Sequence, residues 1–310
     1  MSVSAKRVTL RDVAAASGVS RATAGFVLSD SPAASISEPT RERVRQAARD
    51  LGYVPHGIAR ALREGSSRIV ILAVGWGNDG NYARTFIRGL DAELSAHDHV
   101  LLVRHGQAAG DSMQQVLDAV APRAVLRLAE NYLKPGHEFD DGGWDGGLAG
   151  NSLVQLRYLV TRGHSRIGVA LPDGDQPLGS VRLRFAAEAA AMLDIPVPPP
   201  LFVPRDREAA VRALGEFLAA HDGVTAVAAF DDEVGLRVLA AAAGLGRAVP
   251  GDLAVIGFDD TEYGALSTPA LTTIHIDAED HGRRTARIIL GLDADGFTAA
   301  PAEVIVRESA

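Results

Sequence analysis

The sequence predicts an all-α helix-turn-helix headpiece followed by an α/β core of doubly wound parallel sheets. Two short stretches with helical apolar periodicity meet at Gly18 within Val8–Asp30, which is the pattern of two helices joined by a tight turn. Beyond about residue 68, apolar runs alternate with helical patterns, as in parallel strands covered by helices. The length of 310 residues favours two or three domains.

The start of the first helix is specified by several neighbouring residues. Thr9 is a good N-cap, and Asp12 falls at the third helical position, where a carboxylate can bond back to the cap. Val8 and Val13 have the spacing of a hydrophobic staple. Gly18 can adopt a positive φ, so it is expected to end this helix and turn the chain.

The second helix is predicted to begin after Ser20, which can cap it. Three apolar residues with i, i+3 and i+4 spacing are expected to pack inward: Ala24, Val27 and Leu28. Four residues are expected on the opposite face: Arg21, Ala22, Gly25 and Phe26. In a helix-turn-helix the second helix enters the major groove, so this outer face is the candidate base-reading surface.

A third helix is predicted after Ser37, with an apolar stripe and a basic exterior. The stripe consists of Val44, Ala47, Ala48 and Leu51, and the basic residues are Arg41, Arg43, Arg45 and Arg49. Pro55 can open a further helix of about two turns. A helix this short is marginal alone in water, so it is expected to order only against a partner.

Composition and charge favour a regulator that binds DNA. Residues 1–65 carry ten Lys and Arg against six Asp and Glu, a net charge of +4, whereas the whole chain carries -8. DNA would therefore attract the amino end alone. The chain has no cysteine and no apolar run long enough to cross a bilayer, so it is expected to work in the cytoplasm without membrane contact.

The body of the chain alternates between predicted strands and helices. Predicted strands are Arg68–Val74, Val100–Arg104, Ala124–Leu128, Ile167–Leu171, Val224–Phe230, Leu253–Phe258 and Leu271–Ile276. Helical patterns include Tyr82–Ala96, Asp206–Ala220 and Asp232–Ala243. The proline-rich Ile195–Pro200 is predicted to be a stiff extended connection.

Several motifs resemble the LacI/GalR family of repressors. In the headpiece they are Thr9–Ser20, Thr40–Val44 and Leu51–Leu62, in which only Ser17 and His56 depart from the family pattern. In the body they are Thr161–Gly168, Val249–Glu262, Ser267–Ile274 and Val304–Ser309. The resemblance implies a periplasmic-binding-protein-like core of two lobes joined by three crossing strands, with a small-molecule cleft between the lobes.

The expected domains follow from this resemblance. Residues 1–54 form the headpiece, 55–67 the hinge helix and linker, and 68–310 the effector-binding and dimerisation domain. Its first lobe comprises about 68–165 with 277–292, and its second lobe about 166–276 with 293–310. The first crossing between the lobes is expected near Thr161–Arg166.

The resemblance and the helix pattern together give a set of candidate DNA contacts. These are Thr9, Ser20, Arg21, Ala22, Thr23, Gly25, Phe26, Ser29, Tyr53, Ala59, Leu62 and Arg63. The leucine that corresponds to Leu62 wedges into the minor groove in the family, and packing of the hinge helix on the core is the alternative. Two hinge helices must meet at one kink, which implies a homodimer on double-stranded DNA with an inverted-repeat operator.

Two residues of the second helix depart from the family. Phe26 stands where the family usually has an arginine, and Gly25 replaces a serine. Phe26 is expected either to contact thymine methyl groups or to fold into the core if the helix is rotated. Arg21 is expected to contact either guanine or a phosphate.

The candidate effector residues are Trp76, Arg184, Asp232 and Asp259. Arg184 and Asp259 match ligand-binding residues of the family, and Asp231 and Asp232 stand where the family has Asn-Asp. Arginine and aspartate suit a small polyhydroxyl effector such as a sugar, because each binds two neighbouring groups. A structural ion pair is the alternative for both residues, and packing against the lobes is the alternative for Trp76.

A glycine motif supports a rival hypothesis. Gly75, Gly77 and Gly80 follow a predicted strand and precede a helical pattern, which is the context of a dinucleotide-binding turn. Arg104 and His105 replace the usual acid, so an NADP-binding oxidoreductase is one alternative and a plain tight turn is the other. A solute-binding protein is a further alternative. The favoured prediction is a transcriptional repressor that is not an enzyme and has no cofactor or metal.

Overall fold

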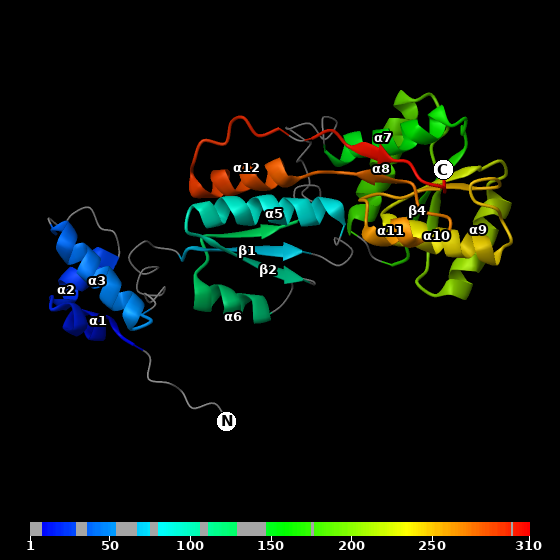
Figure 1. Ribbon diagram of the computed structural model, residues 1–310. Coiled ribbons are helices and arrows are strands. Elements are labelled where there is room, and N and C mark those ends of the chain that lie inside the picture. Colours follow the sequence, from blue (N-terminus) through cyan, green and yellow to red (C-terminus); the bar gives the residue numbers. More distant parts are fainter. Residues whose placement is uncertain are drawn as a thin grey trace. The chain divides into compact units, whose positions relative to one another are not determined.

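A computed structural model describes residues 8–28, 36–53, 67–74, 80–105, 111–128, 147–174, 177–298 and 300–310. The chain divides into two compact units, Met1–Ser67 and Arg68–Ala310 (Figure 1). None of the helices within these described ranges is long and apolar enough to span a membrane.

The first unit contains three helices around a small apolar core. They are α1 (Leu10–Ser17), α2 (Arg21–Leu28) and α3 (Glu38–Asp50). The Thr9 amide donates to Asp12 Oδ2 at 2.8 Å, and Gly18 ends α1 with a φ of 67°. The Thr23 amide donates to Ser20 Oγ at 3.0 Å, so Ser20 caps α2. The predicted capping residues of these two helices are confirmed.

The core of this unit consists of Val13, Ala14, Ala24, Val27, Val44, Ala47 and Ala48. One detail of the predicted third helix was wrong. Leu51 is 38% exposed, because it follows the end of α3 and no longer lies on the buried stripe. Ser37 is at the N-cap position of α3 as predicted, and its hydroxyl bonds to the Thr40 hydroxyl at 3.0 Å.

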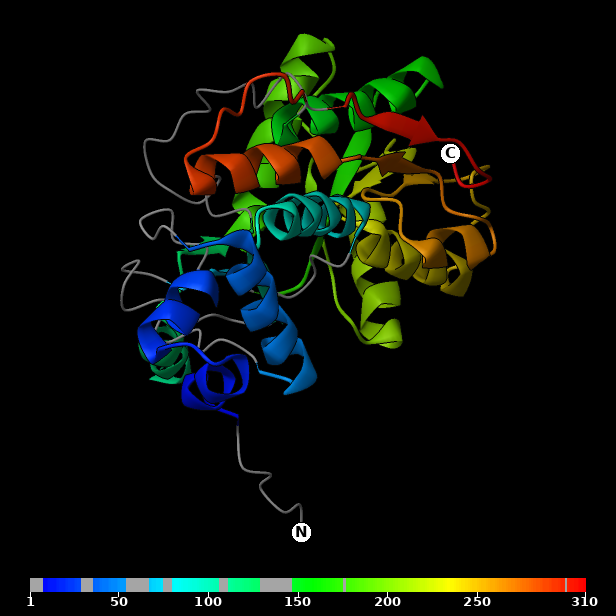
Figure 2. The same cartoon turned by 60° about the vertical axis from the view of Figure 1, so that its left-hand side comes forward.

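The second unit begins with a three-stranded parallel sheet in the order β2-β1-β3. These strands are β1 (Ile69–Val74), β2 (Val100–His105) and β3 (Ala124–Arg127). Helices α5 (Asn81–Ala96) and α12 (Glu279–Leu290) lie side by side on one face, and α6 (Asp111–Val120) lies on the other (Figures 1 and 2). We call this group the first lobe.

The second lobe is built on a parallel sheet in the order β5-β4-β6-β7. Its strands are β4 (Ile167–Pro172), β5 (Pro200–Val203), β6 (Ala226–Ala229) and β7 (Ala254–Ile256). Its helices are α7 (Leu148–Thr161), α8 (Pro177–Met192), α9 (Arg207–Ala220), α10 (Asp232–Gly244) and α11 (Glu262–Leu266). An antiparallel pair, β8 (Thr273–His275) with β9 (Glu303–Ile305), completes it.

The chain passes between the lobes three times, between β3 and α7, between β8 and α12, and between α12 and β9. Helix α7 packs on α8, β6, β8 and β9, so it belongs to the second lobe. The first crossing therefore precedes α7, and the expected crossing at Thr161–Arg166 was wrong. The apolar stripe of α7 shows that it is buried, but the stripe cannot show which sheet covers it.

Candidate nucleic-acid interface and candidate effector site

Helix α2 has the predicted orientation within the first unit. Ala24 and Val27 are buried, whereas Arg21 and Ala22 are exposed and Phe26 is 43% exposed. Phe26 therefore lies on the outer face of α2 and not in the core. Of the two alternatives that the sequence left open, the inward-folded phenylalanine was wrong.

The basic exterior of α3 is partly neutralised by its own carboxylates. Arg49 Nη2 lies 2.6 Å from Glu42 Oε1, and Arg45 Nη1 lies 3.3 Å from Glu38 Oε1. Arg43 Nε donates to Ser17 O at 3.0 Å, which ties α3 to α1. Arg21, at the start of α2, therefore becomes the arginine of greatest interest on the candidate DNA face.

The other candidate DNA contacts have mixed surroundings. The hydroxyls of Ser20 and Thr23 bond to each other at 2.8 Å, and Thr9 bonds to Asp12. Gly25 and Tyr53 are half-buried, and Tyr53 packs against the core of the unit. Ser29, Ala59, Leu62 and Arg63 lie outside the described residues, so their roles remain predictions.

In the second unit, polar side chains gather where β6 and β7 end. Asp231 follows β6 and caps α10, because its Oδ1 accepts from the Val234 amide at 2.7 Å. Asp259 lies three residues beyond β7. The carboxyl ends of parallel strands are where ligands bind in open α/β sheets, so this edge is the candidate effector site.

The arginine at this edge is Arg182 of α8, which sequence reasoning missed. Arg182 is 5% exposed. Its guanidinium donates to Ser152 Oγ at 2.8 Å, Gln155 Oε1 at 3.1 Å and the Ala229 carbonyl at 3.3 Å. It also lies 3.8 Å from the ring centre of Phe258, so the charge is held by hydrogen bonds and an aromatic face.

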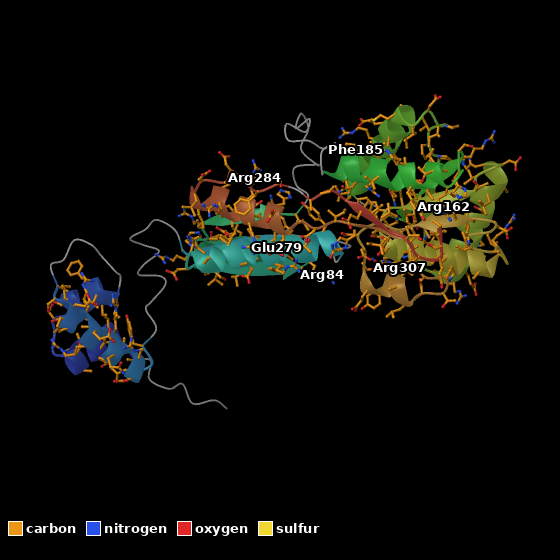
Figure 3. The ribbon with its side chains drawn as sticks, turned by 45° about the horizontal axis from the view of Figure 1, so that its top comes forward. Arg84, Arg162, Phe185, Glu279, Arg284 and Arg307 are labelled. Atoms are coloured by element: carbon orange, nitrogen blue, oxygen red, sulfur yellow. The ribbon has the colours of Figure 1, made fainter. Side chains whose placement is uncertain are left out.

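Arg184, the predicted effector residue, occupies a different face of α8. Its side chain is 50% exposed, and its Nε lies 3.8 Å from Glu188 Oε1. Phe185 of the same helix is buried and is labelled in Figure 3. Residues 182, 185, 186 and 189 share one helical face, so the apolar spacing of α8 could have identified Arg182 as the inward arginine.

Asp232 is fully buried, which differs from the surroundings expected of a ligand-binding residue. Its Oδ2 accepts from the Thr261 amide at 2.6 Å and from the Thr261 hydroxyl at 3.0 Å, and its Oδ1 accepts from the Thr273 hydroxyl. A Cβ at Gly257 would lie 2.1 Å from Asp232 Oδ1. Asp232, the first residue of α10, therefore links this helix to Thr261, which precedes α11, and to Thr273 of β8.

Asp259 connects the two lobes. Its Oδ1 accepts from the Tyr82 amide at 2.6 Å, and its carbonyl accepts from the Asn81 amide at 2.7 Å. Both amides belong to the first turn of α5, and the Asn81 side chain donates to the Ile276 carbonyl at 2.7 Å. Asp259 has a φ of 95°, a conformation that is uncommon for a residue with a side chain.

This contact weakens the dinucleotide hypothesis. A phosphate at the start of α5 would need the amides that already donate to Asp259. A Cβ at Gly80 would lie 1.8 Å from Asp259 Oδ2, so the space at this glycine is filled by a carboxylate. Gly75, Gly77 and the candidate effector residue Trp76 lie outside the described residues.

Burial controls the ionisation of these groups. Burial raises the pKa of Asp259 to about 7, although the Tyr82 amide opposes the shift. Burial also raises the pKa of Asp231 to about 6, against the opposing bond from Val234. Burial lowers the pKa of Arg182 to about 10. Near neutral pH the charges of Asp231 and Asp259 therefore change with pH, whereas Arg182 stays protonated.

We expect Asp231→Asn to stabilise the protein above pH 6. The pKa of Asp231 is about 6 in the folded state against an ordinary value of 3.8, so the folded state binds the proton more tightly. The stability that protonated Asp231 contributes to the folded state is therefore greatest at low pH, and it is lost as the pH rises through about 6. Asparagine keeps the cap on Val234 without the charge. In denaturation experiments at pH 8, the free energy of unfolding of the variant should exceed that of the wild type by about 1–3 kcal/mol, and this difference should vanish near pH 4.

Asp206→Asn is the matched control for this prediction. Asp206 caps α9 through a 2.8 Å bond from the Ala209 amide, but it is exposed. Its replacement should change stability little at either pH. An equal gain in both variants would show that burial of Asp231 is not the cause.

Comparisons with known families agree with this division of the chain. Residues 9–56 match the bacterial regulatory proteins of the lacI family, and residues 156–310 match the periplasmic binding protein-like domain. The HTH-type transcriptional regulator CelR of Thermobifida fusca is 28% identical over 329 residues, which cover 97% of this chain and 96% of CelR.

Solved structures share the fold. The lac repressor dimer bound to operator and the anti-inducer ONPF gives a TM-score of 0.75 at 20% identity, with 98% of this chain and 99% of that chain covered. The complex of transcriptional regulator CelR with cellobiose gives a TM-score of 0.60 at 26% identity, with 98% of this chain and 100% of that chain covered.

A helix-turn-helix unit followed by two α/β lobes defines a class of DNA-binding regulators with a periplasmic binding protein-like domain. This chain belongs to the lacI family of bacterial regulatory proteins.

Proposed function

We propose that the chain is a homodimeric transcriptional repressor that binds an inverted-repeat operator in the cytoplasm. The observation that carries this proposal is the outer face of α2, where Arg21, Ala22 and Phe26 are exposed on a unit of positive charge. A helix of this kind fits the major groove, and its dimer fits two half-sites about one helical turn apart or multiples of it. Leu62 of the predicted hinge would wedge into the minor groove between them.

We further propose that a small polar effector, such as a sugar, alters operator affinity. The carboxyl edge of the second sheet supplies Arg182, Asp231 and Asp259, and Asp259 also contacts the first turn of α5 in the first lobe. A ligand that binds at this edge would change the contact between the lobes. The effect on operator affinity equals the coupling free energy, typically about 1–3 kcal/mol.

The test of the function is a gel shift on the DNA upstream of the chain's own gene. A discrete complex that weakens steeply with salt is expected, because binding releases counterions from phosphates. Repeating the assay with sugars and nucleosides tests the effector. Affinity no higher than for random DNA would exclude the repressor, and saturable NADP quenching of tryptophan fluorescence would favour the oxidoreductase.

We expect Arg21→Ala to weaken operator binding by about 10- to 100-fold, the range for a base-contacting arginine. Arg49→Ala is the matched control, since it removes the same charge from the same unit but from a side chain paired with Glu42. Its effect should stay below about threefold. Equal losses in the two variants would show that net charge, and not the position of Arg21, determines affinity.

A further inference from the structure

The outer face of α2 is largely apolar. Ala22 and Phe26 are one helical turn apart, and both are exposed. Gly25 lies beside them and has no side chain. Buried Ala24 and Val27 fix which face is turned outward. The one hydroxyl in this stretch, that of Thr23, is bonded to Ser20 Oγ at 2.8 Å, so Ala22 and Phe26 themselves present only carbon atoms to DNA.

The major groove has one apolar group that matches such a surface. Guanine, adenine and cytosine present donors and acceptors there, whereas thymine also presents its C5 methyl group. A purine reader at position 22 or 26 would need a guanidinium, ammonium or amide group, and Ala22 and Phe26 have none of these. Apolar contact with a methyl group is the recognition that remains for these two positions.

We propose that Ala22 and Phe26 form a methyl-reading surface, defined by these two residues, that selects thymine in each operator half-site. Residues four apart on a helix are separated by about 6 Å along its axis, and base pairs are about 3.4 Å apart. The two contacts should therefore fall on base pairs roughly two steps apart. The proposal rests on the proposed function, because it requires that α2 lies in the major groove.

Arg21 has a separate role in this arrangement. It lies at the start of the same helix and carries the charge and donors that Ala22 and Phe26 lack. Each half-site should therefore combine a contact to guanine or phosphate from Arg21 with a run rich in A·T pairs opposite Ala22 and Phe26.

The test uses the full-length protein and an operator selected from random DNA. Each thymine of the half-site is replaced in turn by uracil, which removes only the methyl group. At one or two positions binding should weaken about fourfold or more, the ratio expected when one methyl-sized group loses its apolar contact. At these positions 5-methylcytosine should bind more tightly than cytosine, because it presents the same methyl group.

Phe26→Ala separates a base contact from a structural role. Phe26 is 43% exposed and lies outside the apolar core of the unit, so the variant should still fold, with at most a modest fall in melting temperature. It should bind the thymine operator more weakly, and uracil at the Phe26 position should cause no further loss. Phe26→Leu, which keeps an apolar side chain, should retain sensitivity to uracil.

Three results would count against the proposal, and they differ in what they say of the function. If a specific operator is found but no thymine is sensitive to uracil, the methyl-reading surface is wrong and the repressor stands. If no sequence is selected, the proposed function fails and the inference fails with it. Equal sensitivity to uracil in wild type and Phe26→Ala would also overturn the role of Phe26.

Discussion

Replacing Gly282 with alanine should destabilise the second unit by about 3 kcal/mol or more. A Cβ at Gly282 would lie 2.1 Å from the Phe86 carbonyl oxygen and 2.7 Å from the Leu90 amide nitrogen. Both atoms belong to the backbone of α5, so neither can rotate away as a side chain would. Overpacking usually costs about 1–3 kcal/mol, and a clash with backbone should reach the upper end of this range.

Gly89 makes the reciprocal contact from α5. A Cβ there would lie 1.9 Å from the carbonyl oxygen of Glu279, a residue of α12 that Figure 3 labels. The two helices therefore touch backbone to backbone at two places, and separating them would open the first lobe between α5 and α12. Gly89→Ala should have an effect similar to that of Gly282→Ala, and each can be measured by urea denaturation.

Gly215→Ala is the matched control for these glycine variants. Gly215 is also a helical glycine, in α9, but a Cβ there would lie 3.5 Å from the nearest atom of Leu245, an ordinary contact. Alanine should stabilise this helix by up to about 1 kcal/mol. If Gly282→Ala were as stable as wild type, the close approach of α5 and α12 would be wrong.

The elements that the sequence predicts well are those controlled by near neighbours. Thr9 and Asp12 are three residues apart, as are Ser20 and Thr23, so each cap is visible within one turn. The central strands β1, β4, β6 and β7 are also visible, because they are buried on both faces and form continuous apolar runs. The proline-rich stretch that the sequence predicts to be extended also agrees with the structure. It leads into β5, which begins at Pro200 and is an edge strand, where a missing amide is tolerated.

The candidate effector site was less predictable because its contacts are long-range. Asp259 and Tyr82 are 177 residues apart, and Asp232 and Thr273 are 41 residues apart. A motif can show that an aspartate is present at the end of a strand, but it cannot show which donors surround it. The resemblance therefore suggested effector roles for both Asp232 and Asp259, whereas their surroundings in the structure differ.

Arg182→Met should cost about 1–3 kcal/mol of stability, the range for leaving buried hydrogen-bond acceptors unsatisfied. Methionine keeps much of the volume but donates no hydrogen bond. Gln155 Oε1 and the Ser152 hydroxyl would lose their charged donor within the second lobe. Asp259 would also lose the favourable charge of Arg182, so its pKa should rise further.

Arg184→Met tests whether Arg184, the arginine that the resemblance suggests, contacts the effector, as opposed to the buried Arg182. The Arg184 side chain is half exposed and its Nε lies 3.8 Å from Glu188, a geometry that contributes little to stability. We expect a loss below about 1 kcal/mol for this variant in the same denaturation experiment. If Arg184→Met also abolishes the effector response in gel shifts while Arg182→Met retains it, the ligand contacts Arg184, and Arg182 only supports the sheet edge. Equal stability of the two variants would mean that the buried guanidinium does not hold α8 to β6 as its hydrogen bonds indicate.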